Sequence, residues 1–280
     1  MQNIFLNGEY LPINQARISV FDRGFTFGDG VYEVFLVYHR KIFRLQEHLE
    51  RLNNSLSAIY MDNPYSDSQW QELLIKLVMD SPADNQSLYL QITRGVSERD
   101  HAIDIAEKPT VFAMSKPLPE HDFSSGIKAI VADDIRWQLC YIKATTLLAS
   151  VILRHQASLA GAKEAILVKD DSVTEGAASN VFIVIDGVVK TPPKDGRILP
   201  GITRDLVVEL LNESGVVCQE SNITRDELYV AEEIWVTSST WEIVPVVMLD
   251  DTRVGDGRPG QYWERARDIY RQFKEAQRQS

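Results

Sequence analysis

The first part of the chain alternates short apolar runs with turn residues and then takes on the spacing of helices. Two apolar runs, residues 4–6 and 9–12, are joined by Asn7-Gly8, a dipeptide that favours the tight turn of a β-hairpin. Leucine and isoleucine then recur every three or four positions over residues 45–59, which predicts a helix with one apolar face. A second helix is predicted around residues 73–78, and further strands at residues 31–38, 42–45, 87–93 and 111–115.

Residues 115–126 follow neither periodicity and contain two prolines, so we expect them to join two domains. Beyond them, strands are predicted at residues 127–132, 164–168, 180–185, 188–191 and 233–237, and helices after Lys143, after Thr203 and over residues 262–273. Strands and helices in this mixed order predict an α+β fold. We place an N-terminal domain at residues 1–117, a linker at 118–124 and a C-terminal domain at 125–280.

Composition and charge narrow the class of protein. Of the 280 residues, 44% are hydrophobic and 25% are charged, which is ordinary for a soluble enzyme and too polar for membrane spans. The formal net charge of −11 argues against nucleic-acid binding, because phosphate backbones need patches of Lys and Arg. The N-terminus lacks the basic and apolar regions of a signal peptide, and the two cysteines suit a reducing compartment and have no metal-ligand spacing. We therefore expect a cytoplasmic protein that binds neither a membrane nor a metal.

Lys143 stands in an otherwise apolar stretch, directly before a predicted helix. Burying an ammonium group costs several kcal/mol unless it is paired or loses its proton. A lysine whose stem lies along the surface of a helix start is the common interpretation of such a residue. A cation near a helix N-terminus is nevertheless unfavourable, because the dipole there favours anions. A neutral amine at this place is able to react with an aldehyde, which gives Lys143 a chemical role.

Three motifs follow one another in the second half of the chain. They are Ile-Lys-Ala-Thr-Thr-Leu-Leu at residues 142–148, Val-Thr-Glu-Gly-Ala-Ala-Ser-Asn at residues 173–180 and Leu-Pro-Gly-Ile-Thr-Arg-Asp at residues 199–205. Their order and spacing resemble the class IV (fold type IV) pyridoxal-phosphate enzymes, and among these most closely the D-amino-acid transaminases. The resemblance runs from about Phe5 to Phe273. It implies a two-domain α+β fold whose C-terminal domain is a pseudo-barrel.

The resemblance also implies pyridoxal 5'-phosphate as cofactor. Lys143 would bond to its aldehyde and later carry a proton to and from the substrate. Glu175 would keep the pyridine nitrogen protonated, although a glutamate before a glycine is commonly a turn residue. Arg51, otherwise expected on the polar face of a helix, would bind the phosphate. The other implied cofactor contacts are Leu199 on the ring, Ile202 and Thr203 through their main chain at a helix N-terminus, and Ser238 and Ser239.

A loop rich in glycine, serine and charged residues carries Arg99 and His101. Taken alone, such a loop is more often simply exposed to solvent. In D-amino-acid transaminases, an Arg-x-His at this place and a tyrosine matching Tyr32 bind the substrate carboxylate. Two such donors fix which face of the substrate meets the lysine. The family works as homodimers, and the loop is expected to serve the active site of the partner subunit.

We therefore expect transamination of D-amino acids such as D-alanine and D-glutamate, with 2-oxoglutarate or pyruvate as acceptor. A branched-chain L-amino-acid transaminase, an (R)-selective amine transaminase and aminodeoxychorismate lyase are alternatives of the same fold, and the loop with Arg99 and His101 favours D-amino acids over them. A protein without catalysis, binding only a phosphate ligand or a partner, is disfavoured by the presence of Lys143 and Glu175. Residues 144–146 replace a Ser-Leu-Asn segment of the family, which leaves the preferred side chain and acceptor open.

Overall fold

The computed structural model describes residues 3–103 and 108–279, which fold as two compact units. The first unit comprises Met1–Pro119 and Ile142–Leu147, and the second comprises Glu120–Tyr141 and Leu148–Ser280. The segment with Lys143 thus belongs to the first unit, although it follows the linker in sequence. The domain limits that the sequence suggests stay a prediction. Within the described ranges, no helix is both long and apolar enough to cross a membrane.

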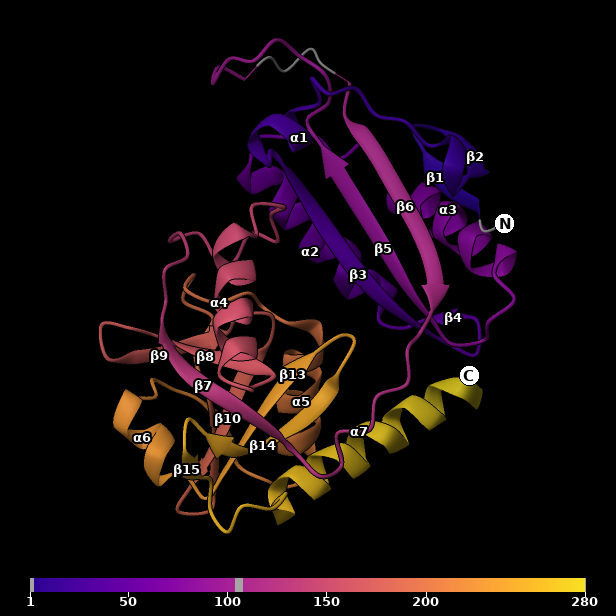
Figure 1. The fold of residues 1–280 in the computed structure, drawn as a ribbon. Helices are drawn as coiled ribbons and strands as arrows, with labels where there is room; N and C mark the ends of the chain where they lie inside the picture. Colours follow the sequence, from indigo (N-terminus) through magenta and orange to yellow (C-terminus); the bar gives the residue numbers. More distant parts are fainter. Residues whose placement is uncertain (1–2, 104–107, 280) are drawn as a thin grey trace. The chain divides into compact units, whose positions relative to one another are not determined.

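A six-stranded sheet forms the first unit, in the order β2-β1-β6-β5-β3-β4 (Figure 1). Its strands are β1 (Asn3–Leu6), β2 (Glu9–Pro12), β3 (Gly30–Tyr38), β4 (Lys41–Ile42), β5 (Gln86–Thr93) and β6 (Thr110–Pro117), all paired antiparallel. A 3-10 turn (Ile13–Gln15) and three helices, α1 (Arg23–Phe27), α2 (Leu45–Ala58) and α3 (Asp67–Asp80), complete the unit. The predicted hairpin, both longer helices and the longer strands are confirmed.

The helices α2 and α3 pack their apolar faces on this sheet. The spacing read from the sequence explains the contact, because Leu49, Leu52 and Leu56 fall on one side of α2 and are buried. Ser66 caps α3 and exchanges hydrogen bonds with Gln69, which fixes where that helix begins. Helices α2 and α3 thus cover one face of the sheet. Helix α1 lies at the end of the sheet where β3 begins (Figure 1).

A nine-stranded sheet forms the second unit, in the order β12-β11-β10-β13-β14-β7-β8-β9, with β15 on β14. Its strands are β7 (Ile127–Asp133), β8 (Glu164–Lys169), β9 (Ser172–Gly176), β10 (Asn180–Ile185), β11 (Val188–Thr191), β12 (Cys218–Glu220), β13 (Glu233–Ser238), β14 (Glu242–Leu249) and β15 (Thr252–Arg253). Strands β9 and β10 also contact each other, although they are not neighbours in this order, so the sheet curls back on itself. Such a curled sheet is the predicted pseudo-barrel.

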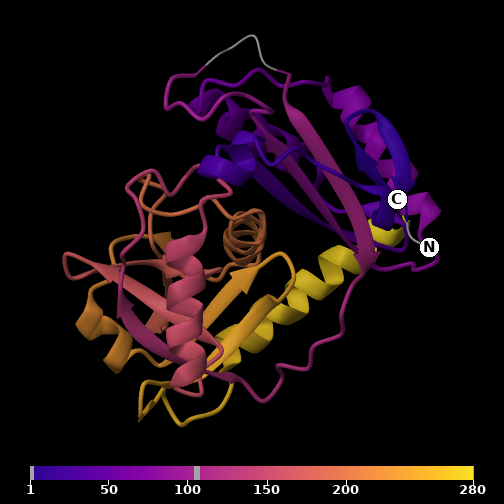
Figure 2. The ribbon, with the colours of Figure 1, turned by 45° about the horizontal axis from the view of Figure 1, so that its top comes forward.

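Four helices accompany this sheet: α4 (Leu148–Leu159), α5 (Ile202–Glu213), α6 (Arg225–Val230) and α7 (Gln261–Gln279). Helix α4 lies across β7 and β8, and α5 packs on β13 and α7 (Figure 2). The helix predicted after Lys143 is confirmed as α4, but it begins only at Leu148, so the interpretation of Lys143 as a residue at the helix start is wrong. Strand β14 was not predicted, and its Pro245 is the reason, since proline rarely occupies a central strand.

Candidate functional site

The segment that carries Lys143 runs alongside the start of β3 in the first unit. The Lys143 carbonyl accepts a hydrogen bond from the Tyr32 N–H at 3.0 Å, and the Thr145 N–H donates to the Gly30 carbonyl at 3.0 Å. Between these two bonds the segment makes one antiparallel bridge with the strand. Pairing with a strand, and not a helix start, therefore fixes the backbone of the lysine.

The side chain of Lys143 lies over an aromatic ring. Its Nζ is 4.3 Å from the centroid of the Tyr32 ring, which in turn stacks on Tyr89 at 5.9 Å between centroids. Burial, together with the neighbouring Tyr32, raises the pKa of Tyr89 to about 12, and its hydroxyl donates to Gln91 at 2.7 Å. Tyr89 thus stays neutral in the physiological range, and the Tyr32 ring that stacks on it offers the amine an aromatic face.

Arg51 is buried, so the expectation that it lies exposed on the polar face of its helix is wrong. Its Nε donates to Oε1 of Glu33 and its Nη2 to Oε2, each at 2.8 Å. His48 lies on the same carboxylate, with Nδ1 2.8 Å from Oε2, and is also buried. Arg51 is therefore oriented by a buried carboxylate, and its role at a phosphate stays a prediction.

Within the group of Glu33, Arg51 and His48, the charges compensate one another. Burial raises the pKa of Glu33, but the Arg51 guanidinium and the hydrogen bonds from Arg51 and His48 outweigh burial and hold it well below its usual range. Burial lowers the pKa of His48, the contact with Glu33 opposes that effect, and the charges of Arg51 and Lys143 add to it. The group therefore consists of an ionised Glu33, a cationic Arg51 and, at neutral pH, an uncharged His48 that donates from Nδ1.

Arg99 and His101 are exposed and lie at the ring of Phe27 in α1. The guanidinium carbon of Arg99 is 5.2 Å from the ring centroid, and the centroid of the His101 ring is 5.4 Å from it. Within the described part of the first unit, no hydrogen bond, ion pair or ring contact joins either residue to Tyr32. The predicted carboxylate ligands Arg99 and His101 therefore do not contact Tyr32 among these residues, and the shared role of the three stays a prediction.

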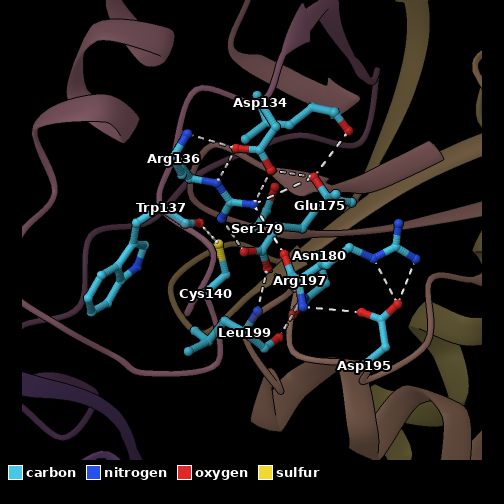
Figure 3. A network of polar contacts seen from close by, with 12 residues as sticks. Asp134, Arg136, Trp137, Cys140, Glu175, Ser179, Asn180, Asp195, Arg197 and Leu199 are labelled. Carbon is cyan, nitrogen blue, oxygen red and sulfur yellow. Dashed lines mark hydrogen bonds and ion pairs between the residues drawn. The ribbon is translucent and has the colours of Figure 1, made fainter. Parts of the chain in front are cut away.

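Glu175 lies in β9, buried at the centre of a polar network in the second unit (Figure 3). Its Oε2 accepts hydrogen bonds from Asn180 Nδ2 and from the Leu199 N–H, each at 3.0 Å. Its Oε1 accepts from Nη1 of Arg136. The Arg136 fork also grips Asp134, at 2.9 Å from Nε and 2.7 Å from Nη2. Glu175 is therefore a strand residue held by hydrogen bonds, and the alternative interpretation of it as a turn residue is wrong.

The network leaves Glu175 able to accept one more donor. Burial raises the pKa of Glu175 to about 7, while the Arg136 guanidinium and the Leu199 N–H act against this rise. A carboxylate oxygen can accept two hydrogen bonds, and among the described residues Oε1 accepts only the one from Arg136. A protonated ring nitrogen fits this remaining capacity, and its positive charge would favour the ionised carboxylate.

The N-terminus of α5 is open to an anion. The helix begins at Ile202, and Gly201 before it provides no side-chain cap. The N–H groups of Ile202 and Thr203 precede the first hydrogen bond inside the helix, which Asp205 donates to the Gly201 carbonyl at 2.9 Å. A Cβ on Gly201 would lie 2.0 Å from Oδ1 of Asn180, so only glycine fits there. This is the arrangement in which helix ends bind phosphate.

A buried hydroxyl near the end of β13 also lacks an acceptor. Oγ1 of Thr237 has no hydrogen-bond partner among the described residues. A buried hydroxyl without a hydrogen-bond partner costs about 1–3 kcal/mol of folding free energy, and a bound acceptor would recover this cost. The half-buried Ser238 and Ser239 follow it directly, and the Ser238 hydroxyl accepts from the Trp241 N–H at 3.2 Å. The donor set of the second unit, together with the half-buried Leu199, therefore fits a phosphorylated pyridine.

The predicted site residues fall into two groups, one in each unit. Lys143, Tyr32, Arg51, Arg99 and His101 lie in the first unit, and Glu175, Leu199, Ile202, Thr203, Ser238 and Ser239 lie in the second. Sequence reasoning missed the residues that hold these side chains in place, namely Glu33, His48, Asp134, Arg136 and Asn180. A charged residue at an inward position of a strand, as Glu33 is in β3, was the available signal. Across residues 3–103 and 108–279, no group of three or more His, Cys, Asp or Glu could hold a metal ion.

Comparison with known sequences gives one family. The family model described as amino-transferase class IV matches residues 30–249. A D-alanine aminotransferase of Bacillus licheniformis is 39% identical over 259 residues, covering 92% of this chain and 92% of its own. A D-alanine aminotransferase of Staphylococcus haemolyticus is 36% identical over 279 residues, covering 99% of each chain.

Solved structures agree with this similarity. A branched-chain amino acid aminotransferase from Escherichia coli matches with a TM-score of 0.88 and 27% identity, covering 95% of this chain and 92% of the other. A second branched-chain amino acid aminotransferase, from T.th. and solved with pyridoxamine 5'-phosphate, matches with a TM-score of 0.89 and 26% identity. That match covers 96% of this chain and 92% of the other. The predicted two-domain α+β fold of type IV is thereby confirmed.

Proposed function

This chain belongs to the class IV aminotransferases and is a pyridoxal-phosphate-dependent enzyme, and we propose that it transfers the amino group of D-amino acids to a 2-oxo acid. Similarity to D-alanine aminotransferases along nearly the whole chain supports the D-amino-acid donor. D-alanine and D-glutamate are the proposed donors, and 2-oxoglutarate and pyruvate the proposed acceptors.

The observation that carries the proposal is the placement of Lys143. A strand holds its backbone, the Tyr32 ring lies 4.3 Å from its Nζ, and no carboxylate pairs with that nitrogen among the described residues. An amine held in this way and not engaged in an ion pair is suited to covalent chemistry and to proton transfer. In our proposal Lys143 takes the proton from Cα of the substrate and returns a proton during the second half of the reaction.

Pyridoxal phosphate, when bound, supplies an electron-accepting ring and an aldehyde for the amino group. The network around Glu175 supports the first of these properties. In our proposal Glu175 holds the proton of the ring nitrogen, Arg136 favours the ionised carboxylate, and the hydrogen bond from Asn180 keeps that carboxylate in place. In the same proposal the N–H groups of Ile202 and Thr203, with Ser239 and Arg51, would hold the phosphate. Ser238 would face the cofactor, and Leu199 would lie on the ring.

The substrate carboxylate is proposed to bind Tyr32, Arg99 and His101. Arg99 and His101 are exposed and therefore accessible to a second copy of the chain. This accessibility supports a homodimer in which the loop serves the partner subunit. Helix α4 further supports it, because Leu148, Val151 and other apolar side chains on it are exposed. Light scattering of the holoenzyme tests the dimer, and a monomer would contradict it.

A cytoplasmic location is proposed with the function. Both cysteines, Cys140 and Cys218, are free thiols, as is common in a reducing compartment. The direct test of the proposed function is an assay of D- and L-amino acids as donors with several 2-oxo acids. The branched-chain L-amino-acid transaminases are the second candidate, since solved structures of that activity share the fold.

A further inference from the structure

The loop with Arg99 and His101 is tied to α1 by its backbone. The Arg23 N–H donates to the Gly95 carbonyl at 2.7 Å, and an isolated bridge joins Asp22 to Val96. Asp22 is buried and caps α1, with Oδ1 accepting from the Gly24 N–H at 2.8 Å. These bonds therefore hold the start of the loop against the start of α1, and a shift of one segment would move the other.

The tip of the loop is held by the side chain of Arg23. Its Nη1 donates to the carbonyl of Asp100 at 2.7 Å and to that of Ala102 at 3.3 Å. These carbonyls lie on either side of His101 in sequence, and Asp100 separates it from Arg99. One guanidinium thus restrains the backbone of both predicted carboxylate ligands.

Arg23 itself is fixed from the other side. It is only 5% exposed, and its Nε donates to Oδ2 of Asp29 at 2.8 Å. Arg94 grips the same carboxylate, at 2.8 Å from Nε and 3.0 Å from Nη2. Burial raises the pKa of Asp29, but hydrogen bonds from Arg94 and Arg23 outweigh burial and hold it below its usual value. The anchor of the loop therefore remains ionised at neutral pH.

The ring of Phe27 completes the support. The guanidinium carbons of Arg23 and Arg99 lie 4.7 and 5.2 Å from its centroid, and the His101 ring centroid lies 5.4 Å from it. Arg99 and His101 are otherwise exposed side chains, which lose much conformational entropy when they bind a ligand. An aromatic face that already restricts both side chains lowers that loss.

We propose that Arg23 and Phe27 are positioning residues that preorganise Arg99 and His101 for the substrate carboxylate. The inference rests on the proposed function and deepens it, because it names what sets the affinity of the site for carboxylate substrates. Neither residue contacts the substrate. Both act through the loop, whichever subunit's active site the loop serves.

The experiment measures KM and kcat for D-alanine in the holoenzyme with Phe27→Leu and Arg23→Lys. Phe27→Leu keeps an apolar side chain but removes the aromatic face, and it should raise KM about two- to fivefold with kcat unchanged. Arg23→Lys keeps the charge at Asp29 but loses the fork that reaches two carbonyls, and it should raise KM about tenfold. Hydrogen–deuterium exchange over residues 98–103 should become faster in both variants.

Matched controls separate positioning from general damage. Phe25→Leu alters an exposed phenylalanine of the same helix and should leave KM and exchange unchanged. Arg94→Lys alters the second guanidinium at Asp29, which donates to the Ile59 and Tyr60 carbonyls and not to the loop tip. It should lower the melting temperature but leave KM near the wild-type value.

The outcomes distinguish this inference from the proposed function. A raised KM in Arg99→Ala beside wild-type KM values in Phe27→Leu and Arg23→Lys would overturn the positioning role alone. An unchanged KM in Arg99→Ala would overturn the proposed carboxylate site, and the positioning role with it. Equal rises in KM for Arg23→Lys and Arg94→Lys would assign the effect to the charge pair at Asp29 and would also contradict the inference.

Discussion

The Nζ of Lys143 lies 4.3 Å from the centroid of the Tyr32 ring, and the backbones of the two residues are joined by a 3.0 Å hydrogen bond. The lysine is therefore positioned by β3, a strand more than a hundred residues earlier in the sequence. Because the strand fixes the backbone and the ring lies beneath the amine, the reactive nitrogen has a defined place that does not depend on an ion pair.

Lys143→Ala should abolish transamination while the protein still folds, because the amine is not a close-packed part of the core. Borohydride treatment of the holoenzyme followed by mass spectrometry should locate the cofactor on Lys143 in the wild type and find no such adduct in the variant. Lys116→Ala, at an exposed lysine, is the control and should behave as wild type. Turnover by Lys143→Ala at the normal rate would remove the lysine from the mechanism.

Glu175→Gln should reduce kcat by orders of magnitude but leave the cofactor attached to the chain. Gln keeps the shape of the side chain but cannot stabilise a protonated ring nitrogen, and without that proton the ring is a poor electron acceptor. Attachment through Lys143 does not need the ring proton. Steady-state kinetics and borohydride labelling of the same preparation test both halves, and an unaltered kcat would make Glu175 a purely structural residue.

The pH dependence of kcat should report on Arg136. Burial raises the pKa of Glu175 to about 7, and the Arg136 guanidinium opposes this. Without that cation the pKa of Glu175 rises further, so the carboxylate becomes protonated at a higher pH. Once protonated, it no longer stabilises the proton on the ring nitrogen. Arg136→Gln should therefore move the acid limb of the kcat profile to higher pH, whereas Arg136→Lys should move it less. An acid limb that does not move in Arg136→Gln would show that this carboxylate does not govern turnover.

Glu33→Gln should destabilise the first unit strongly. The substitution removes the buried charge that both Arg51 and His48 contact, and breaking a buried pair in this way costs about 3–5 kcal/mol. Asp84→Asn removes the counter-ion of Arg40 in an exposed pair, where the loss is about 1 kcal/mol or less. Urea denaturation of the two variants compares the free energies of unfolding. Similar values for both would mean that the Glu33 carboxylate is not a structural centre.

Arg99→Ala should raise KM for D-alanine or D-glutamate roughly ten- to 150-fold, the equivalent of one lost charge-assisted hydrogen bond of about 1.5–3 kcal/mol. Amines without a carboxylate should be affected much less, because they have no group for the arginine to bind. Initial rates with both substrate types make the comparison. Equal losses for the two types would count against the carboxylate site and favour the branched-chain interpretation.

The sequence predicts much of the fold because most elements have a strong local pattern. The apolar spacing of α2, the capping serine of α3 and the Asn7-Gly8 turn are each readable within a few residues. Strand β14 lacks such a local pattern because Pro245 interrupts the sequence of a typical strand. Its pairing with both β13 and β7 makes it a strand. Tertiary pairing of this kind leaves no local signal.

The candidate site was predictable only in part, for the same reason. Motif order identifies Lys143 and Glu175, but the partners that orient them come from distant positions. Arg136 reaches Glu175 across 39 residues of sequence, and Tyr32 lies in a strand of the other half of the chain. The burial of Arg51 was also missed, since its periodicity places it on the polar side of α2 while Glu33 neutralises it inside the unit.

The central claim, that this aminotransferase uses D-amino acids, is tested most directly by the rate of pyruvate formation from D-alanine and from L-alanine. Purified holoenzyme would be assayed with 2-oxoglutarate as acceptor, and L-leucine would be included as a donor for the branched-chain activity. We predict that kcat/KM for D-alanine exceeds the values for L-alanine and L-leucine. A higher kcat/KM for L-leucine, or for L-alanine, would contradict the account.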